Sequence, residues 1–365
     1  MKNNSFISSV WDFRQTRLDE TNYITHDFFR WYGKLIPQLV SRLIKLYSKE
    51  RDLVLANFAG SGTVLLESNL LKRDSIGIDS NPLSILLCKV KTTPFMPNSE
   101  KFLLNLEKYL SSDEKKRFGM DKEDKKWFDE RVFQDLMNIK SKIDEIPIER
   151  ERNYYLLALA GVVRKVSRID SRCINHIVVN KNKPVLNVFL EFKNKIHEMN
   201  SSMSDYIRLA TNSKIEIKRG DARNLKDIKD NSIDLIISHP PYLGYINYSN
   251  IFKLSNKILG YAYGEVKQDD ISTNSISRYI KDMKKAFDEA WRIIKPKKYT
   301  CVIIGDNRVN GEIIPTSSYF INYGLEKGFK LKDIFIWVMS QKAGMSIKRR
   351  GNYVDHNYIL IFRKP

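Results

Sequence analysis

Short apolar runs followed by glycine or by an acidic residue mark the first part of the chain. The run 52–57 leads into the sequence FAGSGT at 58–63, and the run 75–78 ends at Asp79. Between them, apolar positions recur at helical spacing over residues 64–71. The order strand, glycine turn, helix and strand predicts one βαβ unit, and such units build parallel sheets.

The same rhythm returns in the last third of the chain. Strands are predicted over 215–219, 233–238 and 301–305, with a final antiparallel pair over 331–339 and 358–362. A helix is predicted over 280–294. We therefore predict an α/β fold with a doubly wound, Rossmann-like sheet that is mostly parallel and has an antiparallel terminal strand.

Residues 97–212 break this rhythm, because charged segments of helical periodicity replace the strand signals. The clearest of these segments are 127–143 and 154–166. We predict a mostly helical insertion between the second and third strands of the sheet. At the start of the chain, a polar arm is expected to precede a helix over about 37–48.

Charge indicates a kind of partner. The 365 residues include 62 Lys and Arg against 43 Asp and Glu, a formal net charge of +19, which favours a polyanion such as nucleic acid. A host whose proteins are generally rich in lysine would show the same excess, so charge alone leaves both readings open. Basic residues cluster at Lys122, Lys125 and Lys126, over 164–172 and over 348–351. Most such charges belong to solvated helix faces, but 166–172 has the pattern of a loop aimed at phosphates.

The three cysteines, Cys88, Cys173 and Cys301, lie far apart and have no histidine at metal-ligand spacing. We therefore expect reduced thiols and no metal site. No apolar run approaches the roughly 20 residues that span a bilayer, and the chain begins without the apolar core of a signal peptide. The expectation is a cytoplasmic globular protein with no membrane partner.

The glycine turn and the acid after the following strand have the pattern of a nucleoside site. Glycine lets the backbone approach a ligand closely, and Asp79, 17 residues after Gly62, can bind two ribose hydroxyls. A dinucleotide site would need a third glycine at Leu65, and a P-loop would need a lysine after Gly62, so a pyrophosphate ligand is disfavoured. S-adenosylmethionine is a nucleoside without phosphates and fits this pattern. Asp221, after a neighbouring strand, can accept a hydrogen bond from its adenine amine.

The sequence Ser238-His239-Pro240-Pro241-Tyr242 ends a predicted strand. Two prolines fix the backbone and leave carbonyl groups that no β-ladder uses, and such carbonyls can hold a substrate amine. Taken alone, the motif fits an ordinary strand exit equally well. Its position after a nucleoside site favours a role in chemistry.

Four short sequences occur in the order FAGSGT, GIDSNP, GDAR and SHPPY. In this order they resemble the cofactor and catalytic motifs of the DNA amino-methyltransferases, the cytosine-N4 and adenine-N6 DNA methylase family. Residues 26–37 resemble the amino-terminal motif that lies beside the methionine part of the cofactor in this family. Trp127, Phe128 and residues 166–168 are similar to the helical insertion of its cytosine-N4-like members.

The resemblance implies S-adenosyl-L-methionine as cofactor and duplex DNA as substrate. The implied cofactor-binding residues are Tyr32, Lys34, Phe58, Gly60, Gly62, Thr63, Asp79 and Asp221. The implied catalytic residues are Ser238, His239, Pro240, Pro241 and Tyr242. In such enzymes the residue before the prolines and the first proline carbonyl accept the two hydrogens of the target amine. The aromatic residue stacks on a base flipped out of the duplex.

The resemblance also implies an organisation for the chain. Residues 1–96 would hold the amino-terminal motif and the first half of the methyltransferase domain. Residues 97–213 would form the helical insertion, a candidate DNA-recognition region. Residues 214–365 would complete the domain and carry the catalytic motif.

Two residues depart from the family pattern. Asn57 stands where the family usually has aspartate, which removes a negative charge beside the cofactor's ammonium group. His239 stands where the family usually has Ser, Asp or Asn. A neutral imidazole has one acceptor nitrogen and can take an amine hydrogen; alternatively, Ser238 supplies the acceptor.

The function expected from the resemblance is methylation of an exocyclic amine in DNA, with cytosine N4 preferred, in a restriction–modification or defence system with a cognate endonuclease as partner. The alternatives are an adenine-N6 DNA methyltransferase, an RNA amino-methyltransferase and a degenerate, non-catalytic DNA-binding subunit. Cytosine-C5 methylation is disfavoured because none of the cysteines follows a proline. The oligomeric state stays open.

Overall fold

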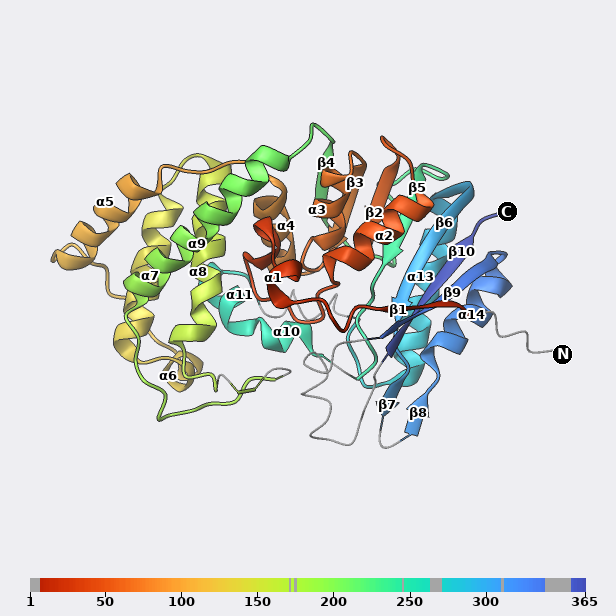
Figure 1. Ribbon diagram of the computed structural model, residues 1–365. Helices are drawn as coiled ribbons and strands as arrows, with labels where there is room; N and C mark the ends of the chain where they lie inside the picture. The colour runs from red at the N-terminus through yellow and green to blue at the C-terminus, as the bar shows by residue number, and fades with distance from the viewer. Residues whose placement is uncertain are drawn as a thin grey trace.

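The computed structural model describes residues 7–170, 172–173, 176–244, 246–262, 271–309, 312–338 and 356–365. Its centre is an eight-stranded sheet in the order β1-β9-β10-β6-β5-β2-β3-β4 (Figure 1). The strands are β1 (Ile7–Asp12), β2 (Leu53–Ala56), β3 (Asp74–Asp79), β4 (Ile215–Arg219), β5 (Ile233–Ser238), β6 (Ile294–Ile304), β9 (Lys330–Val338) and β10 (His356–Arg363). Only β10 runs antiparallel to its neighbours in this sheet. This topology confirms the predicted doubly wound α/β class.

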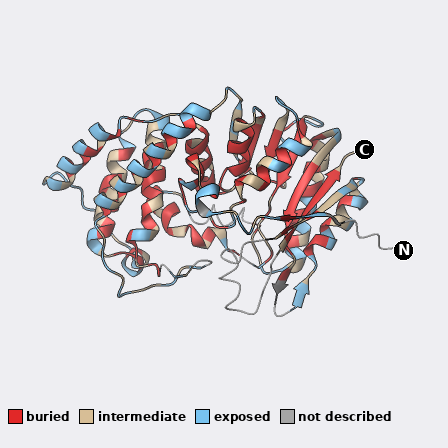
Figure 2. Ribbon diagram, viewed as in Figure 1, coloured by how far each residue is buried: buried red, intermediate tan, exposed pale blue. Residues whose placement is uncertain are grey.

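Alternating side chains of the central strand β5 fill two different cores. Leu235 and Ile237 pack in one cluster with α2 (Pro37–Tyr47) and α3 (Thr63–Leu70), whereas Ile236 packs on the other face with α13 (Ile276–Ile293) and α14 (Thr316–Lys327). Successive strand residues point to opposite faces, so an all-apolar strand is needed wherever both faces are covered. Figure 2 shows the buried strands between helices whose outer surfaces are exposed.

The segment between β3 and β4 is helical in the described residues. It contains α4 (Pro82–Thr92), α5 (Ser99–Ser111), α6 (Lys122–Trp127), α7 (Glu130–Asp144), α8 (Glu149–Val166) and α9 (Val188–Leu209). None of the helices in the described ranges combines the length and apolar composition needed to cross a membrane.

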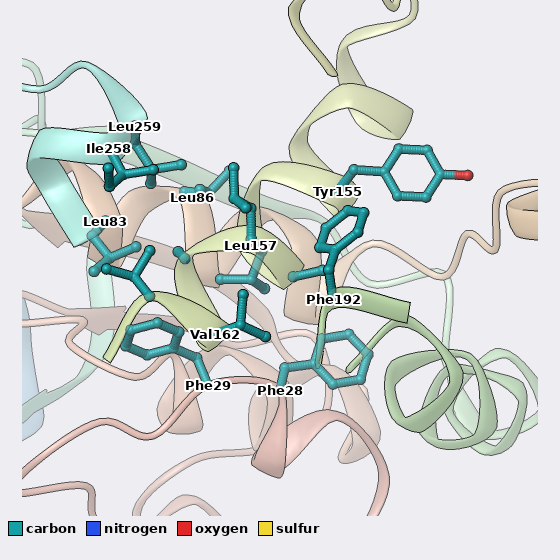
Figure 3. Packing of buried hydrophobic residues seen from close by; sticks show 14 of the residues in the cluster. Phe28, Phe29, Leu83, Leu86, Tyr155, Leu157, Val162, Phe192, Ile258 and Leu259 are labelled. Atoms are coloured by element: carbon teal, nitrogen blue, oxygen red, sulfur yellow. The ribbon is translucent and has the colours of Figure 1, made fainter. Parts of the chain in front are cut away.

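A third core joins the helical insertion to the rest of the molecule. Tyr155 and Leu157 of α8 and Phe192 of α9 share one hydrophobic cluster with Phe28 of the N-terminal segment and Leu86 of α4 (Figure 3). A separately folding domain would keep its apolar contacts to itself. The division of the chain at residues 96 and 213 therefore stays a prediction. The hydrophobic packing is continuous across both of these boundaries.

The polar arm predicted at the start of the chain is wrong, because residues 7–12 form the edge strand β1. This strand pairs parallel to β9, and Trp11, 2% exposed, stacks on Phe335. Where burial is described in this strand, Trp11 is buried and Ser9, Val10 and Asp12 are exposed. A single buried tryptophan in a polar stretch gives no alternating pattern to detect.

Several other boundaries differ from the sequence prediction. β6 begins at Ile294 rather than 301, and its pairing with β5 shifts register near Pro296. α13 begins at Ile276 rather than 280. Short elements absent from the prediction are α1 (Leu18–Thr21), η1 (Ile24–Asp27), α10 (Tyr248–Ile251), α11 (Lys253–Leu259), β7 (Asn307–Val309) and β8 (Glu312–Ile314). The predicted basic loop at 348–351 lies outside the described residues.

Candidate active site

The glycine turn after β2 is tied to the end of β3. The backbone N–H of Gly60 donates to Asp79 Oδ2 at 2.7 Å, and the Ala59 N–H donates to the Ile78 carbonyl at 2.9 Å. Gly60 and Gly62 adopt φ values of +51° and +72°, which residues with a Cβ rarely adopt. The local sequence thus folds into a left-handed turn that brings the Asp79 carboxylate to the start of α3.

A cleft with an empty volume of about 950 Å³, partly open to solvent, lies where the turn meets the exits of β3, β4 and β5. This position, outside the carboxyl ends of parallel strands, is where doubly wound sheets bind ligands. The predicted residues that line the cleft are Phe58, Gly60, Thr63, Asp79, Asp221, His239 and Pro241. The exits of β2 to β5 therefore bring most of the predicted cofactor residues and two of the catalytic ones together.

The remaining predicted cofactor residues lie behind the cleft wall. Gly62 packs against Cys88, and a Cβ added there would meet Cys88 Sγ at 3.0 Å. Lys34 Nζ donates to Asn22 Oδ1 at 2.8 Å and to the His26 carbonyl at 3.2 Å. The Tyr32 side chain is buried, and its hydroxyl has no hydrogen-bond partner among the described residues. Their sequence neighbours Gly33 and Leu35 line the cleft instead.

Asp221 is held by an arginine beside the cleft. Its two carboxylate oxygens accept from Arg223 Nε at 2.9 and 2.8 Å, and Arg223 also pairs with Asp282 of α13 at 3.1 Å. Gly220 and Ala222, on either side, line the cleft as well. Asp221 therefore reaches the cleft as an oriented ion pair, an arrangement that the motif GDAR alone did not reveal.

The residues of the cleft fit a nucleoside that carries an amino acid. Asn57 lines the cleft, is 3% exposed, and its buried Oδ1 has no hydrogen-bond partner within the described part of the chain. Such an atom is an acceptor in need of a donor, which an ammonium group supplies. Asp79, which lines the same cleft, provides the carboxylate that can bind ribose hydroxyls.

The exit of β5 presents alternate residues to the cleft. His239 and Pro241 line it, whereas Ser238 and Pro240 are buried in the wall. His239 Nε2 lies 3.2 Å from the Tyr242 hydroxyl, and the two rings meet edge to face. Burial lowers the pKa of His239 to about 4, so this imidazole is neutral at neutral pH.

Two contacts fix the backbone of this exit. The Tyr279 hydroxyl of α13 donates to the Pro241 carbonyl at 2.9 Å. The Tyr242 ring lies against Gly305 at the end of β6, where an added Cβ would meet Tyr242 Cε2 at 3.3 Å. Tyr242, predicted to stack on a target base, thus packs beside the strand and is not among the residues lining the cleft.

An aromatic wall, formed by Trp31, Tyr248 and Phe252, was missed from the sequence. Trp31 stacks on Phe252 with ring centroids 4.4 Å apart and lies near-parallel to Tyr248 at 6.3 Å, and both Trp31 and Tyr248 line the cleft. A Cβ on Gly33 would meet the Tyr248 hydroxyl at 2.6 Å, and one on Gly60 would meet Trp31 Nε1 at 3.2 Å. In the sequence, this wall was indicated only by a glycine next to aromatic residues, at Tyr32-Gly33. Such a pair is too common to identify a site.

A buried polar network supports the glycine turn from below. Lys91, 1% exposed, donates to the Ser61 carbonyl at 2.9 Å, and His26 Nε2 lies 3.0 Å from Glu67 Oε1, which also accepts from the Tyr23 hydroxyl. Burial raises the pKa of Glu67 to about 7 and lowers that of Lys91 to about 7. Burial reduces the charge on both groups, and the network joins the N-terminal segment, α3 and α4.

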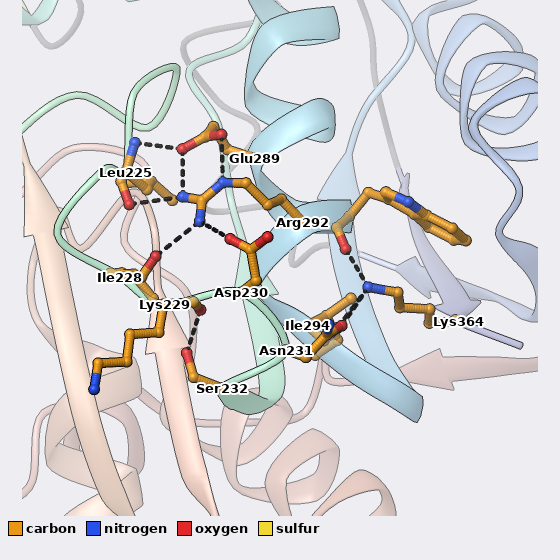
Figure 4. Close-up of polar contacts among 11 residues, drawn as sticks. Leu225, Ile228, Lys229, Asp230, Asn231, Ser232, Glu289, Arg292, Ile294 and Lys364 are labelled. Atoms are coloured by element: carbon orange, nitrogen blue, oxygen red, sulfur yellow. Dashed lines mark hydrogen bonds and ion pairs between the residues drawn. The ribbon is translucent and has the colours of Figure 1, made fainter.

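A second polar network holds the segment that leads into β5 (Figure 4). Arg292 of α13 donates to the carbonyls of Leu225 and Ile228, both at 2.8 Å, and pairs with Glu289 at 2.8 Å and Asp230 at 2.5 Å. An arginine that caps two backbone carbonyls fixes a loop without regular structure. Arg292 therefore holds residues 225–230, which precede β5, against α13.

Comparison with known proteins identifies relatives. The sequence model of a DNA methylase family, of N6 and N4 type, matches residues 1–87 and 233–365. The type II methyltransferase M.MvaI of Kocuria varians is 23% identical, with 81% of this chain and 80% of the relative covered. The type II methyltransferase M.BsoBI of Geobacillus stearothermophilus is 22% identical, with 94% and 86% covered. A SAM-dependent methyltransferase structure from Methanosarcina mazei aligns with a TM-score of 0.39 at 12% identity, over 88% of this chain and 96% of the other.

Proposed function

The chain belongs to the DNA methylase family, and from that premise we propose that it methylates the exocyclic N4 amine of cytosine in duplex DNA. The family relationship makes it a DNA methyltransferase of the N4/N6 type whose cofactor is S-adenosylmethionine. One observation carries the proposal: His239 and Pro241, at the exit of β5, line the same cleft as the glycine turn and Asp79. A methyl donor and an amine acceptor must meet in one place for transfer to occur.

S-adenosylmethionine supplies a methyl group on a positively charged sulfur. In our assignment Asp79 binds its ribose hydroxyls and Gly60 admits the cofactor close to the backbone. Asn57 Oδ1, buried without a partner among the described residues, accepts from the ammonium group. The Asp221–Arg223 pair borders the adenine part of the site.

His239 is the residue we assign to the target amine. The lone pair of an exocyclic amine is delocalised into the ring, and acceptors that draw its hydrogens out of plane restore it as a nucleophile. The cofactor, held by the glycine turn and Asp79, would supply the methyl group, and His239 would accept the proton that the amine nitrogen loses as it takes that group. The low pKa of His239 keeps the imidazole neutral and able to accept.

Tyr242 would determine which nitrogen of His239 is the acceptor. A neutral imidazole has one N–H donor and one acceptor nitrogen. If Nε2–H donates to the Tyr242 hydroxyl 3.2 Å away, Nδ1 is left to accept from the substrate. We therefore assign Tyr242 a positioning role instead of the base stacking predicted from the sequence, and Trp31 and Tyr248 supply the aromatic surface in the cleft.

Cytosine is preferred because the residue before the two prolines is neither Asp nor Asn, which is less like the adenine enzymes. Two type II methyltransferases match most of the chain, which supports a place in a restriction–modification system with a cognate endonuclease. The insertion between β3 and β4 is the candidate recognition region, since the family match leaves out residues 88–232. Recognition sequences differ between enzymes that share one catalytic core.

The test is to express the protein in cells that lack DNA methylation and to analyse their DNA by mass spectrometry of nucleosides and by modified-base sequencing. We expect N4-methylcytosine at one short sequence. N6-methyladenine would replace the cytosine assignment with the adenine alternative. Modified RNA with unmodified DNA would favour the RNA alternative, and no modified base would favour a non-catalytic subunit.

The matched variant for this test is His239→Ala. It should bind S-adenosylmethionine with unchanged affinity by calorimetry but methylate at least about 100-fold more slowly, the usual contribution of a positioned acid or base. His239→Ser, the residue more typical of the family, should recover part of the rate. Wild-type methylation by His239→Ala would exclude the role assigned to this side chain.

A further inference from the structure

The short helix α6 has two chemically distinct sides. Asp121, Glu123 and Asp124 are its acidic residues, and Lys122, Lys125 and Lys126 are its basic ones. The basic residues follow the spacing i, i+3 and i+4, which puts them on one face of a helix. The sequence alone predicted an ordinary solvated helix face for most such clusters of basic residues.

The acidic side is neutralised by α11. Lys257 pairs with Asp121 and Asp124, both at 2.7 Å, and Lys253 pairs with Glu123. Asp124 is only 5% exposed at its side chain, so this contact is an interior one. The acids of α6 are therefore already compensated by lysines from another element.

The basic side has no such compensation. Lys122, Lys125 and Lys126 are exposed, and none of them forms an ion pair with any residue that the structure describes. Lys126 lies over the Trp127 ring at 5.1 Å, which supports its position without cancelling its charge. We call this set the α6 lysine face.

The helix α6 is joined through its acidic side to α11, which follows the wall of the cleft along the chain. Lys253, the partner of Glu123, follows Ser249 of the cleft wall by four residues, a span of at most about 14 Å. Arg168 joins α6 from the other side, donating to the Lys125 carbonyl at 3.0 Å. In Figure 1, α6 and α10 lie on the same, lower side of the molecule.

Basic residues in and after the loop 166–172, which has the pattern expected for binding phosphates, make contacts within the protein. Arg168 contacts Lys125 and lies 3.7 Å from Asp129, and Arg172 pairs with Asp170 at 2.6 Å. Lys183 donates to the carbonyls at the end of α8, at Arg164 and Ser167. These basic groups are engaged within the protein, whereas those of the α6 lysine face are not.

We propose that the α6 lysine face binds the phosphates of duplex DNA beside the base that enters the cleft. This inference rests on the proposed function and names the partner surface of the same site. A duplex that delivers a base to the cleft carries phosphates along the protein surface, and three uncompensated lysines on one helix face complement that charge. Phosphate contacts position the duplex without selecting its sequence.

The experiment measures salt dependence with the full-length protein and a fluorescein-labelled duplex DNA of mixed sequence. Fluorescence anisotropy gives the affinity at NaCl concentrations from about 50 to 200 mM. We expect the triple variant Lys122→Gln, Lys125→Gln and Lys126→Gln to flatten the slope of log affinity against log salt by about 2 to 3, roughly one per lost phosphate contact. A wild-type slope would overturn the proposal.

A matched control lies on α13. Lys281, Lys284 and Lys285 have the same spacing, are equally exposed, and include one lysine over an aromatic ring, Lys284 over Tyr323 at 4.8 Å. Their triple glutamine variant has the same net charge as the α6 variant. We expect its slope to equal that of the wild type; a slope as flat as that of the α6 variant would show a general charge effect and refute the specific surface.

A second measurement needs no variant. Acetylation of wild-type lysines, followed by mass spectrometry, should show that DNA protects the α6 lysine face more than the three lysines of α13. Equal protection would count against the proposal.

These outcomes can be told apart from failure of the proposed function. If the wild-type protein methylates DNA but the α6 triple variant keeps the wild-type salt slope, only this surface is refuted. If the α6 triple variant has the flattened slope but the wild-type protein transfers no methyl group, only the proposed activity is refuted.

Discussion

At the scale of single residues, the contacts at the exit of β5 distinguish the residues that the sequence placed in one motif. The Pro241 carbonyl already accepts from Tyr279, and His239 is held at Nε2 by Tyr242. Ser238, the alternative acceptor, is 5% exposed within the strand and does not line the cleft. The imidazole of His239 is therefore the side chain of this motif that both faces the cleft and can accept a proton.

The charge of His239 should affect the stability of the fold. Its pKa of about 4 in the folded protein lies below the ordinary value of 6.5, so the unfolded chain binds a proton more readily between these values. Wild-type protein should thus lose stability relative to His239→Asn as pH falls from 6.5 towards 4. The loss should reach at most about 3 kcal/mol, since the cleft is partly open to solvent.

Urea unfolding at several pH values in this range measures the difference. The two proteins should differ by a constant free energy above pH 7 and diverge below it. A difference that does not change with pH would mean that His239 is as easily protonated in the folded protein as in the unfolded chain.

At the scale of elements, apolar patterning predicted the largely buried strands β2, β3 and β5 and also β4, which has no fully buried residue. The strands β2, β3, β4 and β5 and the helices α2 and α3 agree with prediction within one or two residues. Patterning failed for β1, which buries mainly one side, and for α10 and α11, which end after one or two turns. Short elements are stabilised by tertiary contacts, and such contacts cannot be read from local periodicity.

The residues of the candidate site were also predicted only in part. Motifs at strand ends predicted the residues that line the cleft, because parallel strands end at one edge of a sheet. Trp31 and Tyr248 were missed because they reach the cleft from an irregular segment and from a short helix. Arg223 was missed because its pairing with Asp221, two residues away, cannot be read from the motif GDAR. Tyr279 was missed because its partner, the Pro241 carbonyl, is distant in sequence.

The contact between α13 and the β5 exit can be tested by Tyr279→Phe. The variant removes one buried hydroxyl and leaves the Pro241 carbonyl without that donor, so we expect a loss of about 1 kcal/mol in stability. It should also slow single-turnover methylation about tenfold, while calorimetry shows unchanged cofactor affinity. A wild-type methylation rate in this variant would contradict the positioning role of Tyr279.

The control for this variant is Tyr206→Phe. Tyr206 is also fully buried and donates to a backbone carbonyl, that of Thr92 at 3.2 Å, but it belongs to α9 and does not line the cleft. It should show a similar loss of stability with a wild-type methylation rate. A comparable slowing in both variants would attribute the effect to general destabilisation.

At the scale of the whole molecule, three hydrophobic cores share helices. Leu65 and Leu66, neighbours on α3, belong to the core against the sheet and to the core of the helical insertion, respectively. Phe28 of the N-terminal segment also packs in the core of the insertion. The helical insertion is therefore built onto the sheet through α3, α4 and the N-terminal segment, with no gap in packing between them.

This continuity predicts cooperative unfolding. Variants that retain only Trp127, in the insertion, or only Trp337, on strand β9 of the sheet, should report the same urea midpoint by fluorescence, because their cores share α3. Circular dichroism of each variant provides the control for any shift caused by the substitutions. Separate midpoints for the two tryptophans would instead support the division at residues 96 and 213 as independent folding units.

The aromatic wall has a thermodynamic consequence. Trp31 sits over Gly60 of the cofactor turn and stacks with Tyr248, which follows the target-amine motif along the chain and occupies the space that Gly33 leaves open. The two rings face one cleft with their centroids 6.3 Å apart. We predict that a ligand that shifts one ring alters the site of the second ligand, and linkage requires the effect to be reciprocal. DNA must then change the affinity for cofactor by the same factor as cofactor changes the affinity for DNA.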